Sequence, residues 1–154
     1  MVAMTAESYF EQGIAKIALR DSQGAISDFT KAIKLKPKYA EAYYKRGHVK
    51  FRLKEYTAAI KDHDKAIELN PKDTKPYHNR GSAKVILKDF AGAIADYSAA
   101  IKLNATDALA YRNRGMAKIK LKDNKGALAD LSKAGKLGDD STAATIREFQ
   151  LDKK

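Results

Sequence analysis

The chain has 154 residues, which is enough for one domain with its own core. It contains no cysteine, so disulfides and cysteine-based catalysis or metal binding are excluded. The net charge of +11 favours an acidic partner, but no block of consecutive basic residues resembles a nucleic-acid-binding arm. No apolar run approaches the roughly 20 residues of a membrane span, no signal peptide is visible, and we expect a cytoplasmic protein.

After a leader at residues 1–5, one pattern repeats four times with a period of 34 residues and no gap. The repeats cover residues 6–39, 40–73, 74–107 and 108–141, and residues 142–154 follow as a final segment. Self-similarity at this spacing indicates an all-α solenoid, in which each repeat contacts its neighbours.

Each repeat is predicted to form two helices joined by a short polar turn. The first helix carries a tyrosine, a glycine and a leucine on one face, at Tyr9, Tyr43, Tyr77 and Tyr111, at Gly13, Gly47, Gly81 and Gly115, and at Leu19, Leu53, Leu87 and Leu121. The second helix carries recurring alanines, among them Ala25, Ala59, Ala93 and Ala127. A glycine within a helix costs about 1 kcal/mol relative to alanine, so we expect these small residues where the paired helices cross closely. Pro37 and Pro71 are expected to end the second helix of their repeats.

These positions resemble those of the tetratricopeptide repeat (TPR) family, over about 90% of the chain. The resemblance implies a right-handed α-solenoid of antiparallel helix pairs. The family's closing proline is replaced by Ala105 in the third repeat and by Asp139 in the fourth. Residues 142–154 resemble the solvating helix that often ends such arrays, with an apolar stripe of Ala143, Ile146 and Phe149.

A ladder of aspartates could indicate acid–base chemistry, at Asp28, Asp62, Asp96 and Asp130. The first helices carry recurring cations on the face that meets the second helix, at Lys16, Lys50, Lys84 and Lys118 and at Arg46, Arg80 and Arg114. We therefore predict structural pairs between these groups. No cysteine nucleophile, glycine-rich phosphate loop or Ser–His–Asp arrangement supports an enzyme, and no cofactor is expected.

The three histidines differ in their expected surroundings. His63 stands where other repeats have Phe29, Tyr97 or Leu131, which predicts a packed, hydrogen-bonded core histidine. The TPR resemblance makes His48 and His78 neighbours on the concave wall. Two histidines without a third ligand make a poor zinc site, so we predict no metal and leave open whether they contact a ligand.

The TPR resemblance also places six positions of each first helix on a concave wall that binds peptides. The predicted ligand-binding residues are Phe10, Ile14, Tyr44, Lys45, His48, Arg52, Lys75, His78, Asn79, Ser82, Arg112, Asn113 and Met116. In peptide-binding members an asparagine at the position of Asn79 and Asn113 bonds the ligand backbone, which suits its one acceptor and two donors. The wall is apolar at its N-terminal end and basic beyond it, so we predict a protein or peptide ligand with an apolar anchor and an acidic stretch.

Three other modes of binding compete with this one. The carboxylate clamp of chaperone-tail TPR domains is kept at only one of five positions in either of two registers, so that mode is not expected. Nucleic-acid binding is favoured by charge alone and predicts a steep salt dependence. A self-assembling scaffold or weak homo-oligomer is the other rival, in which Phe10, Ile14 and Ile17 at one end meet Phe149 and Leu151 of a neighbour.

Overall fold

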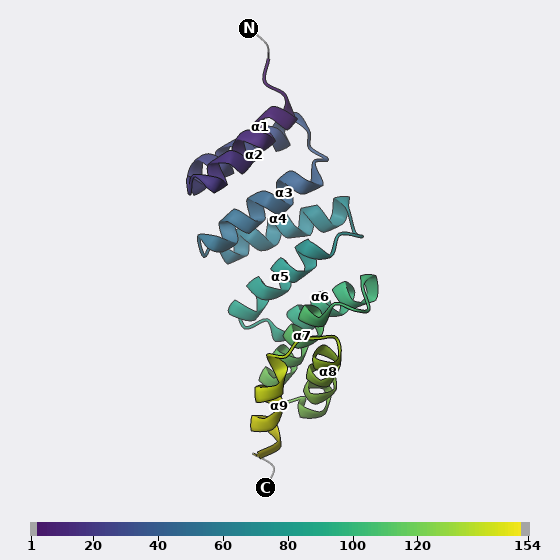
Figure 1. Cartoon of the computed structure of the whole chain (residues 1–154). Coiled ribbons are helices and arrows are strands. Elements are labelled where there is room, and N and C mark those ends of the chain that lie inside the picture. Colours follow the sequence, from purple (N-terminus) through teal and green to yellow (C-terminus); the bar gives the residue numbers. More distant parts are fainter. Residues whose placement is uncertain (1–2, 152–154) are drawn as a thin grey trace. The chain divides into compact units, whose positions relative to one another are not determined.

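The structure is a computed structural model that describes residues 3–151, and this part of the chain is helical with short connections (Figure 1). The helices are α1 (Ala6–Ala18), α2 (Ser22–Leu35), α3 (Ala40–Arg52), α4 (Tyr56–Leu69), α5 (Thr74–Ile86), α6 (Phe90–Leu103), α7 (Ala108–Lys120), α8 (Asn124–Lys136) and α9 (Thr142–Leu151). Each repeat thus contains two helices, which confirms the predicted all-α fold. As predicted, α2 and α4 end shortly before Pro37 and Pro71.

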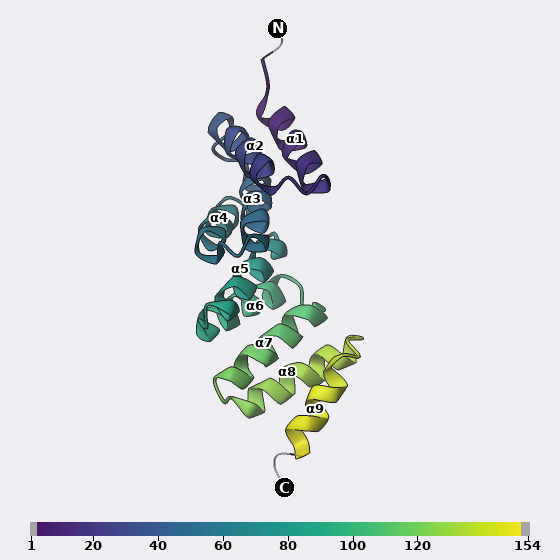
Figure 2. The ribbon, with the colours of Figure 1, turned by 90° about the vertical axis from the view of Figure 1, so that its left-hand side faces the viewer.

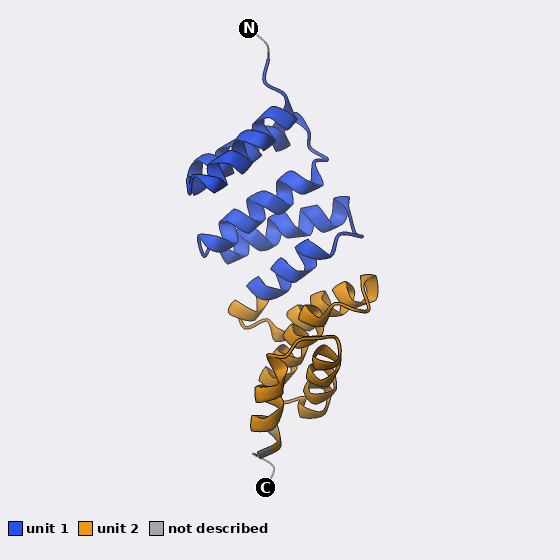
Figure 3. Ribbon diagram, in the orientation of Figure 1, with its two compact units in different colours: residues 1–83 blue, residues 84–154 orange. Residues whose placement is uncertain are grey.

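The chain divides into two compact units, unit 1 at residues 1–83 and unit 2 at residues 84–154 (Figure 3). The boundary falls inside α5, so residues 74–83 of that helix belong to unit 1. In unit 1, α1 packs on α2, α2 on α3 and α3 on α4. In unit 2, α6 packs on α7, α7 on α8 and α8 on α9, and the antiparallel course of α7 and α8 is visible in Figure 2.

Small residues allow the two helices of a repeat to cross at close range. A β-carbon on Gly13 would lie 2.7 Å from Cε1 of Phe29, and one on Gly47 would lie 2.9 Å from Cε1 of His63. Both separations are well below the optimal distance between carbon atoms. The alanines Ala25, Ala59, Ala93 and Ala127 have no exposed surface. At Gly13, Gly47 and Gly115 the prediction that these positions mark the helix crossing is confirmed.

The turn inside each repeat has an unusual backbone. It places a basic residue in the left-handed region, at Arg20, Lys54, Lys88 and Lys122, with φ values of 61°, 64°, 63° and 62°. The leucine just before each of them is exposed, by 79% at Leu19 and 51% at Leu121. The sequence placed these leucines on one helical face with the tyrosine and the glycine, but Leu19, Leu53 and Leu121 lie at the C-cap, where the chain leaves the helix. In α1 the end is closed by the amide of Asp21, which donates to the Lys16 carbonyl at 2.9 Å.

Candidate functional site

The aspartate ladder is structural, as predicted. Arg46 donates hydrogen bonds of 2.9 and 2.6 Å to the two carboxylate oxygens of Asp62, and the Lys50 ammonium lies 2.8 Å from Asp62. Asp62 is only 4% exposed, so its charge depends on these partners. Lys16 pairs with Asp28 at 2.6 Å and Lys84 with Asp96 at 3.0 Å.

Unit 2 repeats the arrangement around Asp130. Burial raises the pKa of Asp130, but hydrogen bonds from Arg114 and Lys118 outweigh burial and hold the pKa below its ordinary value. The carboxylate is therefore an ion-pair partner at neutral pH.

Sequence reasoning missed a second role of these arginines. Nη1 of Arg46 also donates to the hydroxyl of Thr30 in the preceding repeat, at 3.0 Å. Nη1 of Arg114 does the same to Ser98, at 3.1 Å. A hydroxyl or carboxylate sixteen residues before the arginine is the signal that could have found this contact, since Arg80 donates to Asp64 at 2.6 Å.

The predicted wall is best defined in unit 1, where three polar side chains from two helices meet. Nδ2 of Asn79 on α5 lies 3.2 Å from Nδ1 of His48 on α3. The ring of Tyr44, one turn before His48, lies 6.3 Å from the His48 ring between centroids, and Asn79 is near enough to the Tyr44 hydroxyl to offset part of the rise that burial causes in its pKa. All three side chains are half-buried, so part of each polar group faces solvent.

Burial sets the protonation of this cluster. Burial raises the pKa of Tyr44, and the nearby Asp73 adds to that rise. Burial lowers the pKa of His48 below its ordinary 6.5, and the charges of Arg52 and Lys45 act in the same direction. The imidazole of His48 is therefore neutral at neutral pH, and one of its nitrogens is available as a hydrogen-bond acceptor.

A cavity of about 440 Å³ opens beside this cluster, also within unit 1. Its basic lining includes Lys38, Lys45 and Lys75, and none of these three lysines pairs with a carboxylate within the described residues. Tyr39 and Tyr44 contribute aromatic surface. We call this set the lysine pocket.

The remaining lining of the lysine pocket is already engaged in part. Nζ of Lys36 lies 2.8 Å from Oε1 of Glu7 and 4.6 Å from the centre of the Tyr39 ring. Of the two acidic lining residues, Asp73 accepts a hydrogen bond of 3.0 Å from the backbone of Lys75, and Glu41 is exposed. Cations outnumber anions in the pocket, so it favours an anionic group.

Of the predicted contacts of unit 1, Phe10 lies in the core and Ile14 is partly buried beside it. Phe10 is only 6% exposed and packs on Phe29 and Tyr39, with ring centroids 5.6 and 5.0 Å apart. Ile14 packs against the same cluster. Phe10 is therefore a support for Tyr39, since α1 lays its apolar face on α2 and α3. Arg52 and Lys75 are exposed, and His78 and Ser82 are half-buried on α5.

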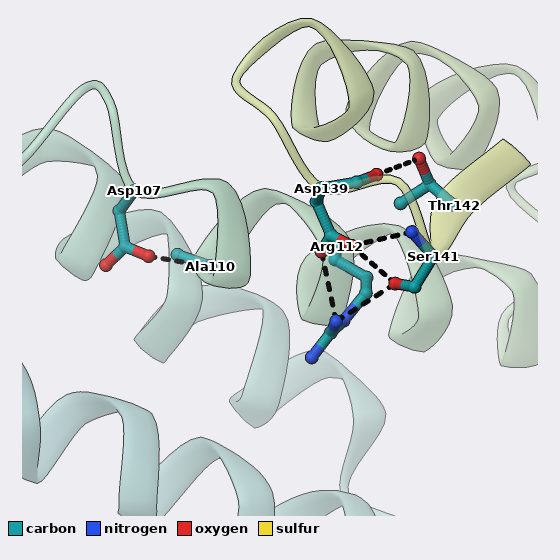
Figure 4. A network of polar contacts seen from close by, with 6 residues as sticks. All are labelled: Asp107, Ala110, Arg112, Asp139, Ser141 and Thr142. Carbon is teal, nitrogen blue, oxygen red and sulfur yellow. Dashed lines mark hydrogen bonds and ion pairs between the residues drawn. The ribbon is translucent and has the colours of Figure 1, made fainter.

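In unit 2 the predicted contact Arg112 is engaged by the chain itself. Its Nη1 donates to the carboxylate of Asp139 at 3.0 Å and to the hydroxyl of Ser141 at 3.1 Å (Figure 4). These contacts fasten the connection between α8 and α9. Asn113 is half-buried and Met116 is 43% exposed on α7. Phe149 and Leu151 were predicted to support self-association, and their side chains lie outside the part of the chain that the structure describes.

His63 is a core residue, but the predicted hydrogen bond is absent. Its side chain is completely buried, and within the described residues neither ring nitrogen has a hydrogen-bond partner. Burial lowers its pKa to about 4. The ring faces Gly47 as Phe29 faces Gly13 in the first repeat, and the centre of the Tyr44 ring lies 5.9 Å away.

Across residues 3–151 no group of three or more histidine, aspartate or glutamate side chains is placed to hold a metal ion. In the same part of the chain, every helix is too short or too polar to cross a lipid bilayer.

Comparison with known proteins agrees with the repeat geometry. A model described as "Tetratricopeptide repeat" matches residues 40–73, and one described as "TPR repeat" matches residues 21–54 and 81–122. The chain belongs to the tetratricopeptide repeat family. A TPR array is a protein–protein interaction module, and the family is generally non-enzymatic. The search of curated proteins gives no match.

Solved TPR structures share the fold. A crystal structure of MamA protein has a TM-score of 0.92 at 24% identity, covering 99% of this chain and 84% of that one. A MamA fragment from Desulfovibrio magneticus RS-1 has a TM-score of 0.80 at 26% identity, covering 86% and 75%. The first TPR domain of Spaghetti (RPAP3), bound to the HSP90 peptide SRMEEVD, has a TM-score of 0.74 at 25% identity, covering 79% and 97%. The chain is thus similar to several TPR α-solenoids.

Proposed function

We propose that this TPR protein binds an acidic peptide segment on the wall of unit 1, with an acidic side chain in the lysine pocket. The observation that carries the proposal is the set of unpaired lysines, Lys38, Lys45 and Lys75, around a cavity with aromatic walls. Lysine ammonium groups attract carboxylates and raise the rate of association.

Specificity along the peptide comes from the neighbouring cluster. Asn79 bonds the backbone of an extended ligand, as the corresponding asparagine does in peptide-binding TPR domains. An apolar or aromatic ligand side chain packs on Tyr39 or Tyr44, where each Å² of apolar surface removed from water contributes about 25 cal/mol. The preformed helices of the wall reduce the ordering cost on the receptor side.

The peptide in the related RPAP3 structure, SRMEEVD, is acidic, which supports an acidic ligand here. The clamp positions differ, however. This chain has Tyr44 and His48 where a chaperone-tail clamp has lysine and asparagine. We therefore propose that the protein recognises acidic residues within the ligand together with the ligand backbone, and that it does not require a C-terminal carboxylate.

A displayed peptide library selected against the whole protein tests the proposal. We expect enriched sequences to be acidic with one apolar residue, and their binding to fall at least tenfold in a Lys45→Glu/Lys75→Glu variant. The matched control is Lys34→Glu/Lys61→Glu, which makes the same change in net charge at exposed positions of α2 and α4. Enrichment of basic peptides, or equal loss of binding in both variants, would contradict the proposal.

A further inference from the structure

The amide of Asn79 is oriented by residues of another helix. An asparagine amide has two N–H donors on nitrogen and one carbonyl acceptor. Its nitrogen lies 3.2 Å from Nδ1 of His48, and the same amide is near enough to the Tyr44 hydroxyl to offset part of the rise that burial causes in the pKa of that group. Within the described residues, Oδ1 of Asn79 accepts no hydrogen bond. The carbonyl oxygen is therefore the group that this arrangement leaves for a ligand.

The bond to His48 fixes the tautomer of the imidazole. Nδ1 can accept from Asn79 only if it carries no proton, so the ring proton of the neutral imidazole resides on Nε2. When His48 takes up a second proton, Nδ1–H becomes a donor that faces the N–H of Asn79. Two donors cannot bond each other, so the amide must turn and present Oδ1 to His48.

The surroundings of His48 keep the neutral form in place at neutral pH. From its own helix, Lys45 and Arg52 bring positive charge, and from α4 the ring of His63 lies close enough to interact with it. From α5, Asn79 offers an uncharged amide. Protonation of His48 therefore requires mildly acidic conditions, below its ordinary pKa of 6.5.

We propose that His48 is a positioning residue that holds Asn79 with its carbonyl oxygen toward the ligand, and that proton uptake by His48 reverses the amide. This inference rests on the proposed function, because the ligand group concerned is a backbone N–H of the bound peptide. At neutral pH the site accepts that N–H. In acid the reversed amide presents its N–H group in the same place. The backbone N–H of the bound peptide then faces a donor, and the hydrogen bond that it made to Oδ1 of Asn79 at neutral pH is lost.

The orientation is tested without a ligand, by NMR of the whole protein. We expect the Nε2–H tautomer of His48 at about pH 7.5, and Asn79 side-chain amide signals that shift with the midpoint of the His48 titration. Asn113 is the internal control, because it holds in the fourth repeat the position that Asn79 holds in the third. The repeat before it has Ser82, which does not titrate, at the position of His48. An Nδ1–H tautomer, or Asn79 signals indifferent to that titration, would overturn the inference.

Two variants separate positioning from simple packing. His48→Asn keeps an acceptor near the place of Nδ1 but does not titrate, so the Asn79 amide should stay ordered and become independent of pH. His48→Ala removes the acceptor, and the Asn79 amide protons should exchange faster with solvent while the unfolding midpoint reports whether the fold is intact. Equal behaviour of the Asn and Ala variants would overturn the positioning role.

A selected peptide supplies the binding readout. From about pH 7.5 to about pH 5.5 at constant ionic strength, we expect the wild type to lose about 3- to 10-fold in affinity, as for one hydrogen bond. The affinity of the His48→Asn variant, whatever its value at neutral pH, should be the same at both pH values. Wild-type binding that ignores pH would overturn the regulation. Failure to select any peptide would count against the proposed function alone, because the NMR measurement needs none.

Discussion

Helices α3 and α7 are the first helices of their repeats, yet they use their outer faces differently. Toward their second helices they are alike, because Arg46 and Arg114 each grip an aspartate of that helix and a hydroxyl of the preceding repeat. On the wall, Tyr44 and His48 of α3 lie beside an open pocket, while Arg112 of α7 is tied to Asp139. Repeated positions thus build the scaffold, and the varied ones decide which wall is left for a partner.

The largest expected effect tests the shared half of this comparison. Asp62→Ala and Asp130→Ala should each cost about 3–5 kcal/mol, because each leaves a lysine and an arginine without their buried partner. Urea unfolding followed by circular dichroism measures the cost. The contrast is Asp139→Ala, which removes the partly exposed pair with Arg112 and should cost less than about 1 kcal/mol. An equal loss of unfolding free energy in all three variants would contradict the contrast between the buried and the partly exposed pairs.

His63 should make the second repeat sensitive to acid. Its pKa is about 4 in the folded protein and about 6.5 when exposed, so the unfolded chain takes up the proton first as the pH falls. The contribution of neutral His63 to the free energy of unfolding is therefore fully present above pH 6.5. It declines between about pH 6.5 and pH 4, by about 3 kcal/mol in total. His63→Phe copies Phe29 of the first repeat and should remove this slope. The test is to measure the unfolding midpoints of the wild type and the His63→Phe variant between pH 6.5 and pH 4. The same dependence of stability on pH in both proteins would contradict this role of His63.

The smallest effect concerns the turns, where the two units should behave alike. Lys54→Gly and Lys122→Gly should each stabilise the protein by up to about 1 kcal/mol, because glycine adopts the observed positive φ without strain. The control, Lys61→Gly inside α4, should destabilise by about 1 kcal/mol. Thermal melting of the three variants gives the comparison. Destabilisation at both turns would show that the lysine side chains contribute contacts of their own.

The helix pairs, the small-residue crossings and the buried Asp–Lys pairs were predictable, because each is repeated at the same spacing and fixes one geometry. The exposure of Leu19 was not, since the pattern does not reveal where a helix ends within a turn. The burial of Phe10 was missed because the resemblance assigns its position to the wall, while the aromatic rings around it decide its packing.

The candidate site followed the same division. The wall residues Tyr44, His48 and Asn79 were named from the sequence, but their mutual contacts depend on side-chain rotamers that no spacing encodes. Arg112 pairs with Asp139 instead of facing a ligand, and this pair depends on the connection before α9, where the family's usual proline is absent. Repetition therefore predicts the frame, and the unrepeated residues need coordinates.

The double grip of Arg46 and Arg114 has a consequence for how the protein unfolds. Each guanidinium joins its own repeat to the one before it, so opening the earlier repeat leaves the arginine without its hydroxyl acceptor and with only the aspartate of its own repeat as a partner. In an array whose stability is a sum of repeat and nearest-neighbour terms, such shared groups strengthen the neighbour term. Within each unit, adjacent repeats should therefore melt together as one cooperative block, and fraying should begin at helices that lack this link, such as α1 and α9.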